Sequence, residues 1–380
     1  MHAADDLREA QRIMAICNAC RYCEGHCAVF PAMEMRLHFT HDDLNYLANL
    51  CHNCGACYHH CQYADPHEFN VNVPRTLSKV RVASYAEFVW PRCMRGVFAK
   101  NGYWIALLTV VCVTAFVVAT ALLTASGSFF SAHANAFYGV IRHGIMAGLF
   151  SVVALFALLA MTLGTVSFWR SLGLPGVSAV GGGRLLSAIH DAFTLQYLRG
   201  GSADGCTYPD ETPSQLRRYF HHLTFYGFLL CFAATSVGAL YHYAFAWPAP
   251  YEFVSLPKLF GVSGGIALLI GPAGLLWLKH QADRRAVDES TAGMDVAFLL
   301  LLFVTSATGI ALMLVGDTPL VGVFLTVHLG VVLSLFLCMP YGKFIHGLLR
   351  LVALVAYAHE RRQGAALQPP TERLLPDAEL

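Results

Sequence analysis

Charged residues are scarce in this 380-residue chain, since Asp, Glu, Lys and Arg together make up 13% of it against 56% hydrophobic residues. Soluble globular domains carry about 25% charged residues, so the composition excludes an ordinary soluble protein. The formal net charge of +1 supplies no excess of Lys and Arg for phosphate backbones, and we expect no nucleic-acid partner. The composition predicts a membrane protein in contact with lipid.

Several short signals are also missing. Residues Met1 to Arg12 contain no hydrophobic signal core, and no C-x-x-C pair is followed by His, which excludes covalent attachment of haem. Gly181-Gly182-Gly183 lacks the spacing and the Lys of a phosphate-binding loop, and favours a flexible linker. No Ser/His/Asp or paired-carboxylate arrangement stands out. We expect no substrate-transforming site on this chain.

Uncharged apolar runs occupy most of the chain after residue 100. A bilayer core about 30 Å thick needs roughly 20 apolar helical residues, and six windows meet that need without any Asp, Glu, Lys or Arg. They are Tyr103–Ala125, Gly144–Phe168, Leu223–Trp247, Leu259–Leu278, Val296–Val315 and Leu320–Met339. The predicted fold is mainly α, with a cysteine-containing domain at 1–100, a six-helix transmembrane bundle at 101–360 and a flexible tail at 361–380.

Basic residues in the connections predict the orientation, because Lys and Arg concentrate on the cytoplasmic side. If six helices alternate, only Arg142 and Lys258 fall on the outer side. The long 169–220 connection, with an amphipathic stretch at 184–198, and both termini are then cytoplasmic. The inner side receives Arg92, Arg95, Lys100, Arg170, Arg184, Arg199, Arg217, Arg218, Lys279, Arg284, Arg285, Lys343, Arg350, Arg361 and Arg362.

Eight of the thirteen cysteines form a repeated pattern near the N-terminus. Two runs have the spacing C-x2-C-x2-C-x3-C, in which three thiolates bind one cubane and the fourth cysteine binds the other cluster. We predict two [4Fe-4S] clusters in a small helical, ferredoxin-like domain. One is assigned to Cys17, Cys20, Cys23 and Cys61, and the other to Cys51, Cys54, Cys57 and Cys27.

Structural zinc is the alternative for these cysteines, but zinc sites pair two C-x2-C knuckles across a longer spacer. Ala28 and Gln62 also stand where bacterial ferredoxins place a proline after the fourth cysteine. The other five cysteines have no partner spacing and receive no role. They are Cys93, Cys112, Cys206, Cys231 and Cys338.

Histidines are the candidates for carrying electrons into the membrane. An ionisable residue inside a transmembrane segment indicates function, and facing helices commonly hold haem between two histidines. We pair His242 with His328 toward the outer side, and His346 with His221 or His222 at the inner side. His143 is an alternative outer ligand. The other interpretation is that each histidine is hydrogen-bonded at an interface.

Helical geometry orders these choices. His328 and His346 are eighteen residues apart, which places them on one face about 27 Å apart if the helix continues past Pro340. On the third window a helical wheel puts His221 about 60° around the axis from His242, and His222 on nearly the opposite face. The wheel therefore favours His221.

The cysteine runs lie in the segments Cys20-Arg21-Tyr22-Cys23, Cys27-Ala28-Val29-Phe30-Pro31-Ala32 and Leu50-Cys51-His52-Asn53-Cys54-Gly55-Ala56-Cys57-Tyr58. The segment Pro66-His67-Glu68-Phe69 follows them. Together these segments resemble the tricarballylate/citrate utilisation protein B family. The resemblance covers nearly the whole chain. It implies an iron–sulfur and haem b protein, with one haem or two, of the bacterial inner (cytoplasmic) membrane. The His328/His346 interval also resembles the last haem-bearing helix of respiratory nitrate reductase gamma subunits.

The same resemblance implies a function. Electrons from a cytoplasmic FAD-containing dehydrogenase acting on tricarballylate would pass through the clusters and haem b to the quinone pool. Two alternatives stay open at this stage. The chain could oxidise quinol and send electrons outward to a soluble reductase, or the clusters could form a redox sensor that the helices only anchor.

Overall fold

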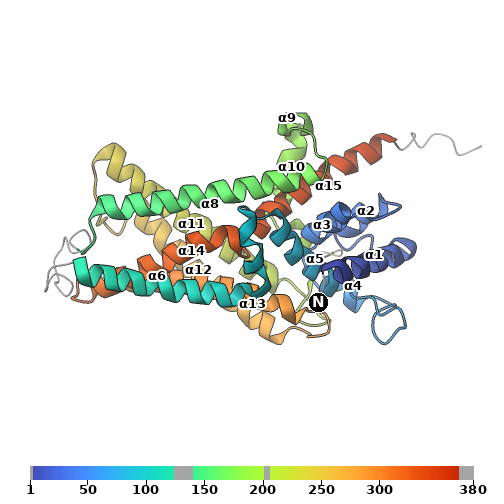
Figure 1. Ribbon diagram of the computed structural model, residues 1–380, viewed down its shortest axis with the longest axis horizontal. Helices are drawn as coiled ribbons and strands as arrows, with labels where there is room; N and C mark the ends of the chain where they lie inside the picture. Colours follow the sequence, from blue (N-terminus) through green and yellow to red (C-terminus); the bar gives the residue numbers. More distant parts are fainter. Residues whose placement is uncertain (1–2, 124–139, 201–205, 368–380) are drawn as a thin grey trace, which may run out of the picture.

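The computed structural model describes residues 3–123, 140–200 and 206–367, and it divides into two halves along its long axis (Figure 1). Six described helices are long and apolar enough to cross a membrane. They lie side by side in one half, while the short N-terminal helices lie in the other (Figure 1). The predicted fold class, mainly α with six apolar helices after a cysteine-containing segment, is confirmed.

The six apolar helices follow the predicted windows closely. The first window, Tyr103–Ala125, falls on α6, and its last two residues lie outside the described part of the chain. Many apolar side chains on these helices face outward. Those of Leu122 and Val152, for example, are 80% and 67% exposed. The helices are α6 (Asn101–Leu123), α8 (His143–Ser171), α11 (Leu216–Phe245), α12 (Leu256–Gln281), α13 (Glu289–Leu314) and α14 (Val321–Cys338).

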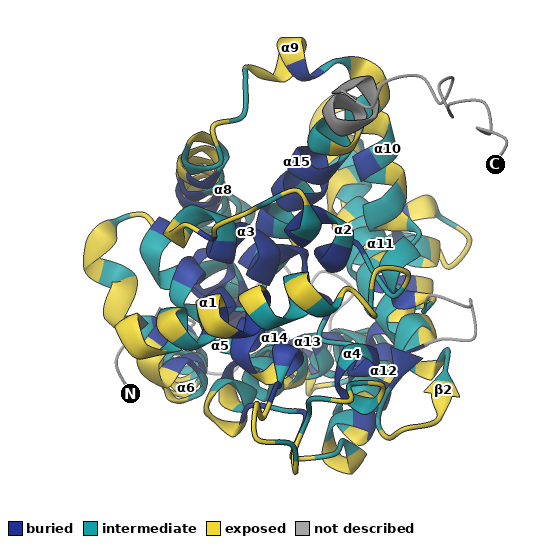
Figure 2. Ribbon diagram, turned by 90° about the vertical axis from the view of Figure 1, so that its right-hand side faces the viewer, coloured by how far each residue is buried: buried dark blue, intermediate teal, exposed yellow. Residues whose placement is uncertain are grey.

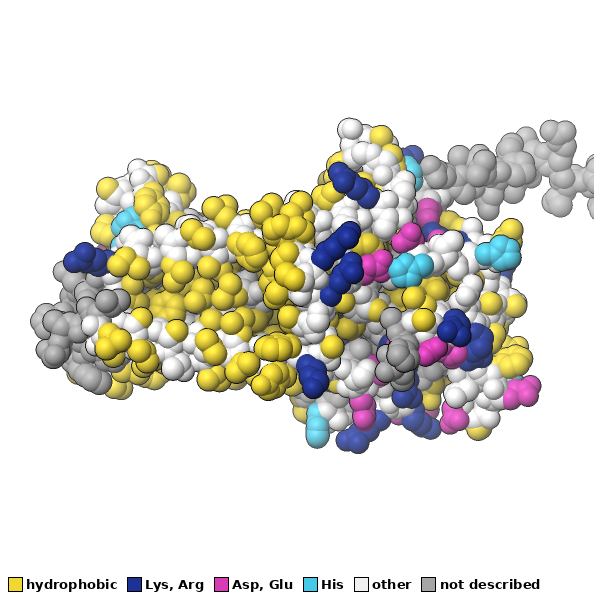
Figure 3. Space-filling view, viewed as in Figure 1, with side chains coloured by type: hydrophobic (Ala, Val, Ile, Leu, Met, Phe, Trp, Pro, Cys, Tyr) yellow, Lys and Arg dark blue, Asp and Glu magenta, His cyan; other side chains and the backbone are white. Residues whose placement is uncertain are grey.

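Hydrophobic side chains cover the helical half, and most charged side chains gather on the other half (Figure 3). An exposed apolar surface of this extent is unfavourable in water and favourable in lipid. The chain is therefore a membrane protein, with one half in the bilayer and the other in water. Glycine lets α11 and α12 approach closely: a Cβ on Gly264 of α12 would lie 2.8 Å from the Gly227 carbonyl oxygen of α11.

Short elements build the cysteine-containing half. Helix α3 begins with a capping box, because the Thr40 hydroxyl accepts from the Asp43 backbone N–H while the Asp43 carboxylate accepts from the Thr40 N–H. Helix α5 has Pro74 in its first turn and Asn72 as its cap. The elements are α1 (Ala3–Cys20), α2 (Val29–Glu34), α3 (His41–Leu50), α4 (Ala56–His59), α5 (Val73–Phe88) and the 3-10 segment η1 (Arg92–Lys100).

The long connection after α8 folds onto the cysteine-containing half. Its predicted amphipathic stretch forms α10 (Gly182–Phe193) and the short η3 (Gln196–Leu198), and α10 packs against the C-terminal helix. Helix α9 (Val177–Val180) precedes it. Strands β1 (Cys206–Thr207) and β2 (Pro213–Ser214) then pair antiparallel, with Cys206 opposite Ser214.

One geometric expectation is wrong. Helix α14 ends at Cys338, a 3-10 turn η4 (Met339–Tyr341) follows, and a separate helix α15 (Ile345–Leu367) begins six residues after Met339. Pro340 has no N–H to continue the helical ladder, and its ring clashes with the preceding turn. His328 and His346 therefore lie on different helices, and the straight-helix spacing between them does not apply.

Helix α15 becomes the central helix of the cysteine-containing half. It runs away from the membrane helices beside α3 and α10 (Figure 1). Leu349, Ala353, Leu354 and Val355 are buried in the same hydrophobic core as residues of α1, α3 and α5 (Figure 2). The predicted flexible tail at 361–380 is partly helical, since α15 continues to Leu367, and 368–380 lie outside the described residues.

Candidate functional site

The first cysteine group lies around one cavity. Cys17 and Cys20 lie in the last turn of α1, Cys23 follows in a turn, and Cys61 lies just after α4. All four line a cavity whose apolar wall includes Phe30 and Val73. The cavity thus brings together the four residues that the spacing assigned to one cluster, including Cys61 from the second run, and Cys57 of the other group lines it as well.

The second cysteine group is buried between α3, α4 and the start of α2. Cys51 caps α3, and the left-handed Gly55, with φ of 81°, begins the turn that carries Cys57. After burial, Cys54 and Cys51 raise the pKa of Cys27 most among the thiols and Cys23 raises it less, while Cys27 contributes to the raised pKa of Cys57, so these thiols lie near one another. The crossed arrangement of two cysteine runs is therefore present in the fold, while the ligand assignments stay predictions.

Soft thiolates at these spacings are the ligands that iron–sulfur clusters use, so both groups fit a cluster. Burial, with neighbouring thiols as the second cause, raises the pKa of Cys17 and of Cys23 to about 12. These thiols are protonated at neutral pH without metal, and binding must release their protons. The backbone N–H of Asn53 donates to the Cys51 Sγ at 3.3 Å, as expected around a cluster sulfur.

A fifth thiol, that of Cys206, lies beside the second cysteine group. The sequence did not indicate this contact, because no other cysteine stands near Cys206 in the chain. Cys206 of β1 is 1% exposed and donates to the Leu198 carbonyl oxygen. A Cβ on Gly55 would lie 2.6 Å from the Thr207 carbonyl oxygen, so β1 lies directly on the Cys54–Gly55 turn. The interaction with the neighbouring Cys206 side chain is the main cause that lowers the pKa of Cys54 to about 6.

Three arginines converge on the backbone of the second cysteine run. Arg81 and Arg350 donate to the Cys51 carbonyl oxygen, the former at 2.6 Å. Arg217 donates to the carbonyl oxygens of Asn53 and His52 at 2.6 and 3.0 Å. They come from α5, α15 and the start of α11. Their positive charge stabilises negative charge on the nearby thiolates.

His52 joins this region to the membrane helices. It is 6% exposed, and its Nδ1 contacts Arg350 Nη1. Burial, followed by the Arg350 charge, lowers the pKa of His52 well below its ordinary value, so the ring is neutral. His52 is therefore buried against the arginine.

His221 of α11 and His346 of α15 form an inner histidine site. Their ring centres are 6.2 Å apart with planes at 77°. Imidazole nitrogens bind a transition metal at about 2 Å, so two rings sharing one metal from opposite sides have centres about 6 Å apart. His221 Nδ1 is also buried without a hydrogen-bond partner among the described residues. This arrangement fits a bis-histidine haem.

A chain of polar contacts orients His346. Its Nδ1 lies 2.6 Å from the Lys343 carbonyl oxygen, the contact that typically fixes the tautomer of a metal-binding histidine and leaves Nε2 for the metal. The Lys343 ammonium lies 2.8 Å from Asp295, which also pairs with Lys279 at 2.9 Å. Helices α12 and α13 thereby hold the turn that begins α15.

The remaining predicted histidines lie elsewhere. His222 contacts Tyr226 instead of His346, so the inner pair is His221 with His346, as the helical wheel favoured. Toward the outer side, His242 stacks on His143 with ring centres 3.9 Å apart and planes at 23°. His328 Nδ1 lies 3.0 Å from the Thr308 hydroxyl of α13. The outer pair of His242 with His328 stays a prediction.

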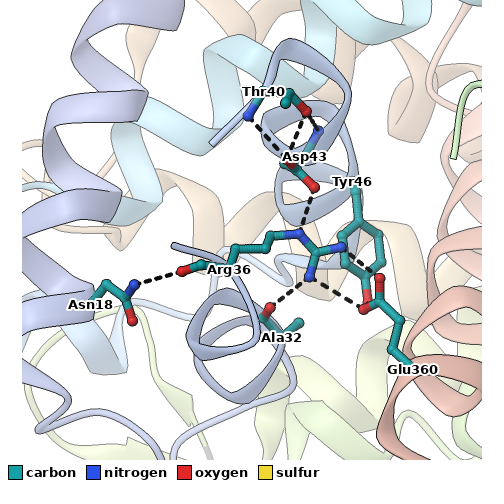
Figure 4. Close-up of polar contacts among 7 residues, drawn as sticks. All are labelled: Asn18, Ala32, Arg36, Thr40, Asp43, Tyr46 and Glu360. Carbon is teal, nitrogen blue, oxygen red and sulfur yellow. Dashed lines mark hydrogen bonds and ion pairs between the residues drawn. The ribbon is translucent and has the colours of Figure 1, made fainter. Parts of the chain in front are cut away.

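A polar network fastens α15 to the cysteine-containing half (Figure 4). Arg36 donates to Glu360 of α15 at 2.6 Å and to Asp43 at 2.5 Å, and its guanidinium lies over the Tyr46 ring. The Tyr46 hydroxyl donates to Glu360 at 3.1 Å. Helix α15 is thus held at both ends, by His346 and Lys343 at its start and by Glu360 near the far end.

Together the fold and the paired cysteine groups define a membrane protein with an iron–sulfur domain. A family model described as "Citrate utilization protein B" matches residues 101–367, and one described as "Citrate utilization protein B Fer4-like domain" matches residues 10–87. The chain belongs to the citrate utilization protein B family. It is 45% identical over 356 residues to "Citrate utilization protein B" of Escherichia coli, covering 94% of this chain and 93% of that protein. No solved structure matches.

Proposed function

We propose that this protein carries electrons from a cytoplasmic flavoprotein dehydrogenase to quinone in the membrane. Residues 1–100 together with α15 hold two [4Fe-4S] clusters, one on Cys17, Cys20, Cys23 and Cys61, the other on Cys51, Cys54, Cys57 and Cys27. The helices of 101–360 hold haem b. The presence of iron–sulfur chemistry is supported by the Fer4-like match and by the two thiol groups.

The observation that carries this proposal is the link that Arg350 makes between the second cysteine run and the helix that bears His346. Arg350 touches the Cys51 carbonyl oxygen and the His52 ring, and it lies one helical turn after His346 on α15. His221 faces His346 from α11. No membrane-spanning distance separates the two sites, so electrons need not cross a long stretch of protein between them.

His221 and His346 are the residues that would hold the inner haem, which supplies a one-electron carrier within the membrane. The chain's own part is placement. The Lys343 carbonyl oxygen fixes the His346 ring, and Arg81 and Arg217 would place positive charge beside a cluster held by the second cysteine group. A second haem would require outer ligands, and the stacked rings of His143 and His242 do not supply two opposed nitrogens to one iron.

The flavoprotein would dock at the first cysteine group, which lies at the end of the protein away from the membrane helices. Tyr22, between two of these cysteines, is 68% exposed, so this loop is open to a partner. The family resemblance indicates an FAD-containing dehydrogenase acting on tricarballylate, and the name of the Escherichia coli relative refers to citrate utilization. We propose a tricarboxylate dehydrogenase as the electron donor.

The proposed location is the bacterial inner membrane, with the cysteine-containing half and both termini in the cytoplasm. The uneven distribution of Lys and Arg between the two sides supports this orientation. Cysteine-rich segments with thiolate ligands also suit a reducing compartment.

Metal and haem analysis of the purified protein tests the proposal. Anaerobically purified protein should contain about eight non-haem iron atoms and acid-labile sulfide per chain, in line with two cubane clusters, and a pyridine-haemochromogen spectrum of haem b. Reduced flavoprotein should bleach the Fe–S absorption and sharpen the haem α-band. A colourless protein carrying zinc would contradict the proposal.

A further inference from the structure

An apolar groove lies where the cysteine-containing half meets the membrane helices. It is bounded by the end of α5, the following two residues, the inner part of α8, η4 and the start of α15, with walls that include Tyr85, Phe88, Trp90, Ala160, Gly164 and Ile345. Gly164 lies seven residues before the end of α8, about 10 Å along the helix. The groove therefore lies at the end of α8 that adjoins the cysteine-containing half, beside the apolar surface of the membrane helices.

One polar group on the wall has no partner. The Tyr85 side chain is 1% exposed, and its hydroxyl makes no hydrogen bond to any residue that the structure describes. A buried hydroxyl without a partner is unfavourable, so the Tyr85 hydroxyl is a donor that a ligand's acceptor atom could satisfy. Burial raises the pKa of Tyr85 to about 12, so the phenol remains protonated at neutral pH and can donate.

The walls of the groove approach each other closely, and its open edge lies at the apolar surface of α8. A Cβ on Gly164 would lie 2.7 Å from the Phe88 carbonyl oxygen, so α8 and the end of α5 approach at backbone distance. Ala160, one turn earlier, is 2% exposed. Trp90 is 37% exposed and its ring lies 6.2 Å from Phe156, which is itself 38% exposed on α8. Small wall residues with aromatic rings at an open edge suit a planar ring that enters from the bilayer.

The groove also adjoins the proposed electron path. Ile345 and Leu349 line it, and they are the chain neighbours of His346 and Arg350. Arg350 contacts the second cysteine run. A ligand in the groove would thus lie beside both the inner histidine site and the Cys51 loop.

We propose that this groove binds the quinone ring, with the Tyr85 hydroxyl donating a hydrogen bond to one quinone carbonyl. The assignment rests on the proposed function, which it deepens by naming the substrate site. Reduction of the ring to quinol takes two electrons, supplied singly from the flavoprotein through this chain, and two protons from cytoplasmic water. A phospholipid acyl chain could fill an apolar groove but offers no acceptor at Tyr85.

Photolabelling tests the site without depending on turnover. The full-length protein in phosphatidylcholine nanodiscs is illuminated with a short-chain azidobenzoquinone, and the labelled peptides are identified by mass spectrometry. Label is expected on peptides containing 85–90 or 160–164, and excess decyl-benzoquinone should remove it. Label confined to other segments, or label that decyl-benzoquinone does not displace, would overturn the assignment.

Two variants add a second readout. Tyr85→Phe should raise the KM for decyl-benzoquinone about tenfold, the loss expected for one hydrogen bond, and leave dithionite reduction of the cofactors unchanged. Ala160→Leu should reduce photolabelling by filling the groove. The controls are Tyr103→Phe, at an exposed phenol on α6, and Ala157→Leu, at a buried alanine one turn away on α8 that does not line the groove. Wild-type KM and labelling in both test variants would overturn the assignment.

Failure of the groove and failure of the proposed function give different results. If the wild-type protein reduces decyl-benzoquinone but the label maps elsewhere, only the groove is wrong. If protein that contains its clusters neither binds nor reduces any quinone, the proposed function itself is wrong. A labelled groove together with a normal KM in Tyr85→Phe would contradict the role of the hydroxyl.

Discussion

The inner histidine site and the outer histidine group, which comprises His143, His242 and His328, contain the same side chain in different surroundings. At the inner site, the ring centres of His221 and His346 are 6.2 Å apart, and a carbonyl oxygen fixes one ring. In the outer group two rings stack at 3.9 Å and the third contacts a threonine. Two histidines at a similar depth in the membrane are therefore not, by that alone, placed to hold a haem between them.

The two histidine groups also differ in the residues that surround their rings. The inner site continues through Arg350 to the second cysteine run, and Lys343 is held by the partly buried carboxylate of Asp295. The outer group contacts aromatic rings and the small residues Thr308 and Gly309 of α13. We therefore expect substitutions at the inner site to affect the cofactors strongly, and equivalent substitutions in the outer group to affect them weakly.

The largest expected effect is on haem content. His346→Ala removes one of two opposed ligands, so the purified variant should lose the pyridine-haemochromogen signal while keeping its non-haem iron. His242→Ala, the matched change in the outer group, should keep most of the haem. Full haem in His346→Ala, with loss in His242→Ala or His328→Ala, would reverse the comparison.

A smaller effect is expected on the second cluster. Arg350→Gln removes one positive charge near the Cys51 loop, and an effective dielectric constant near 20 predicts a fall in reduction potential of roughly 50–100 mV. EPR-monitored redox titration measures this. The cluster on Cys17, Cys20, Cys23 and Cys61 serves as the internal reference and should not shift. Arg350→Lys keeps the charge, so a full shift in that variant would show that charge is not the cause.

The smallest effect concerns the attachment of α15. Glu360→Gln weakens the contact with Arg36, whose side chain is 14% exposed, and should lower the free energy of unfolding by about 1 kcal/mol. Thermal denaturation followed by tryptophan fluorescence measures the change. Asp5→Asn removes a partner from the exposed Arg8–Asp5 pair and should have almost no effect. Equal losses in the two variants would mean that the buried network adds no stability of its own.

Local sequence was enough to predict the membrane helices and the cysteine groups. Apolar runs located all six membrane helices because length and hydropathy are properties of one segment, although α11 and α13 begin seven residues before their predicted windows. The spacing of the cysteines likewise depends on one short segment. Pro340 signalled the end of α14, yet the reappearance of a separate helix at Ile345 could not be deduced, because it depends on burial against α3 and α10.

Long-range contacts could not be predicted. Arg350 and Cys51 are separated by 299 residues, and Cys206 has no neighbouring cysteine in the sequence, so neither showed a spacing that indicates a site. Likewise, the contact of His242 with His143 depends on the relative rotation of α8 and α11, which a helical wheel of one segment does not contain.

Stopped-flow oxidation of the fully reduced protein in nanodiscs tests the central claim most directly, namely that electrons leave the cysteine groups through the inner histidine site. On mixing with decyl-benzoquinone, the Fe–S absorption of the wild-type protein should recover rapidly, and in His346→Ala its recovery should slow by about a hundredfold or more. Recovery at the wild-type rate in His346→Ala would contradict the account.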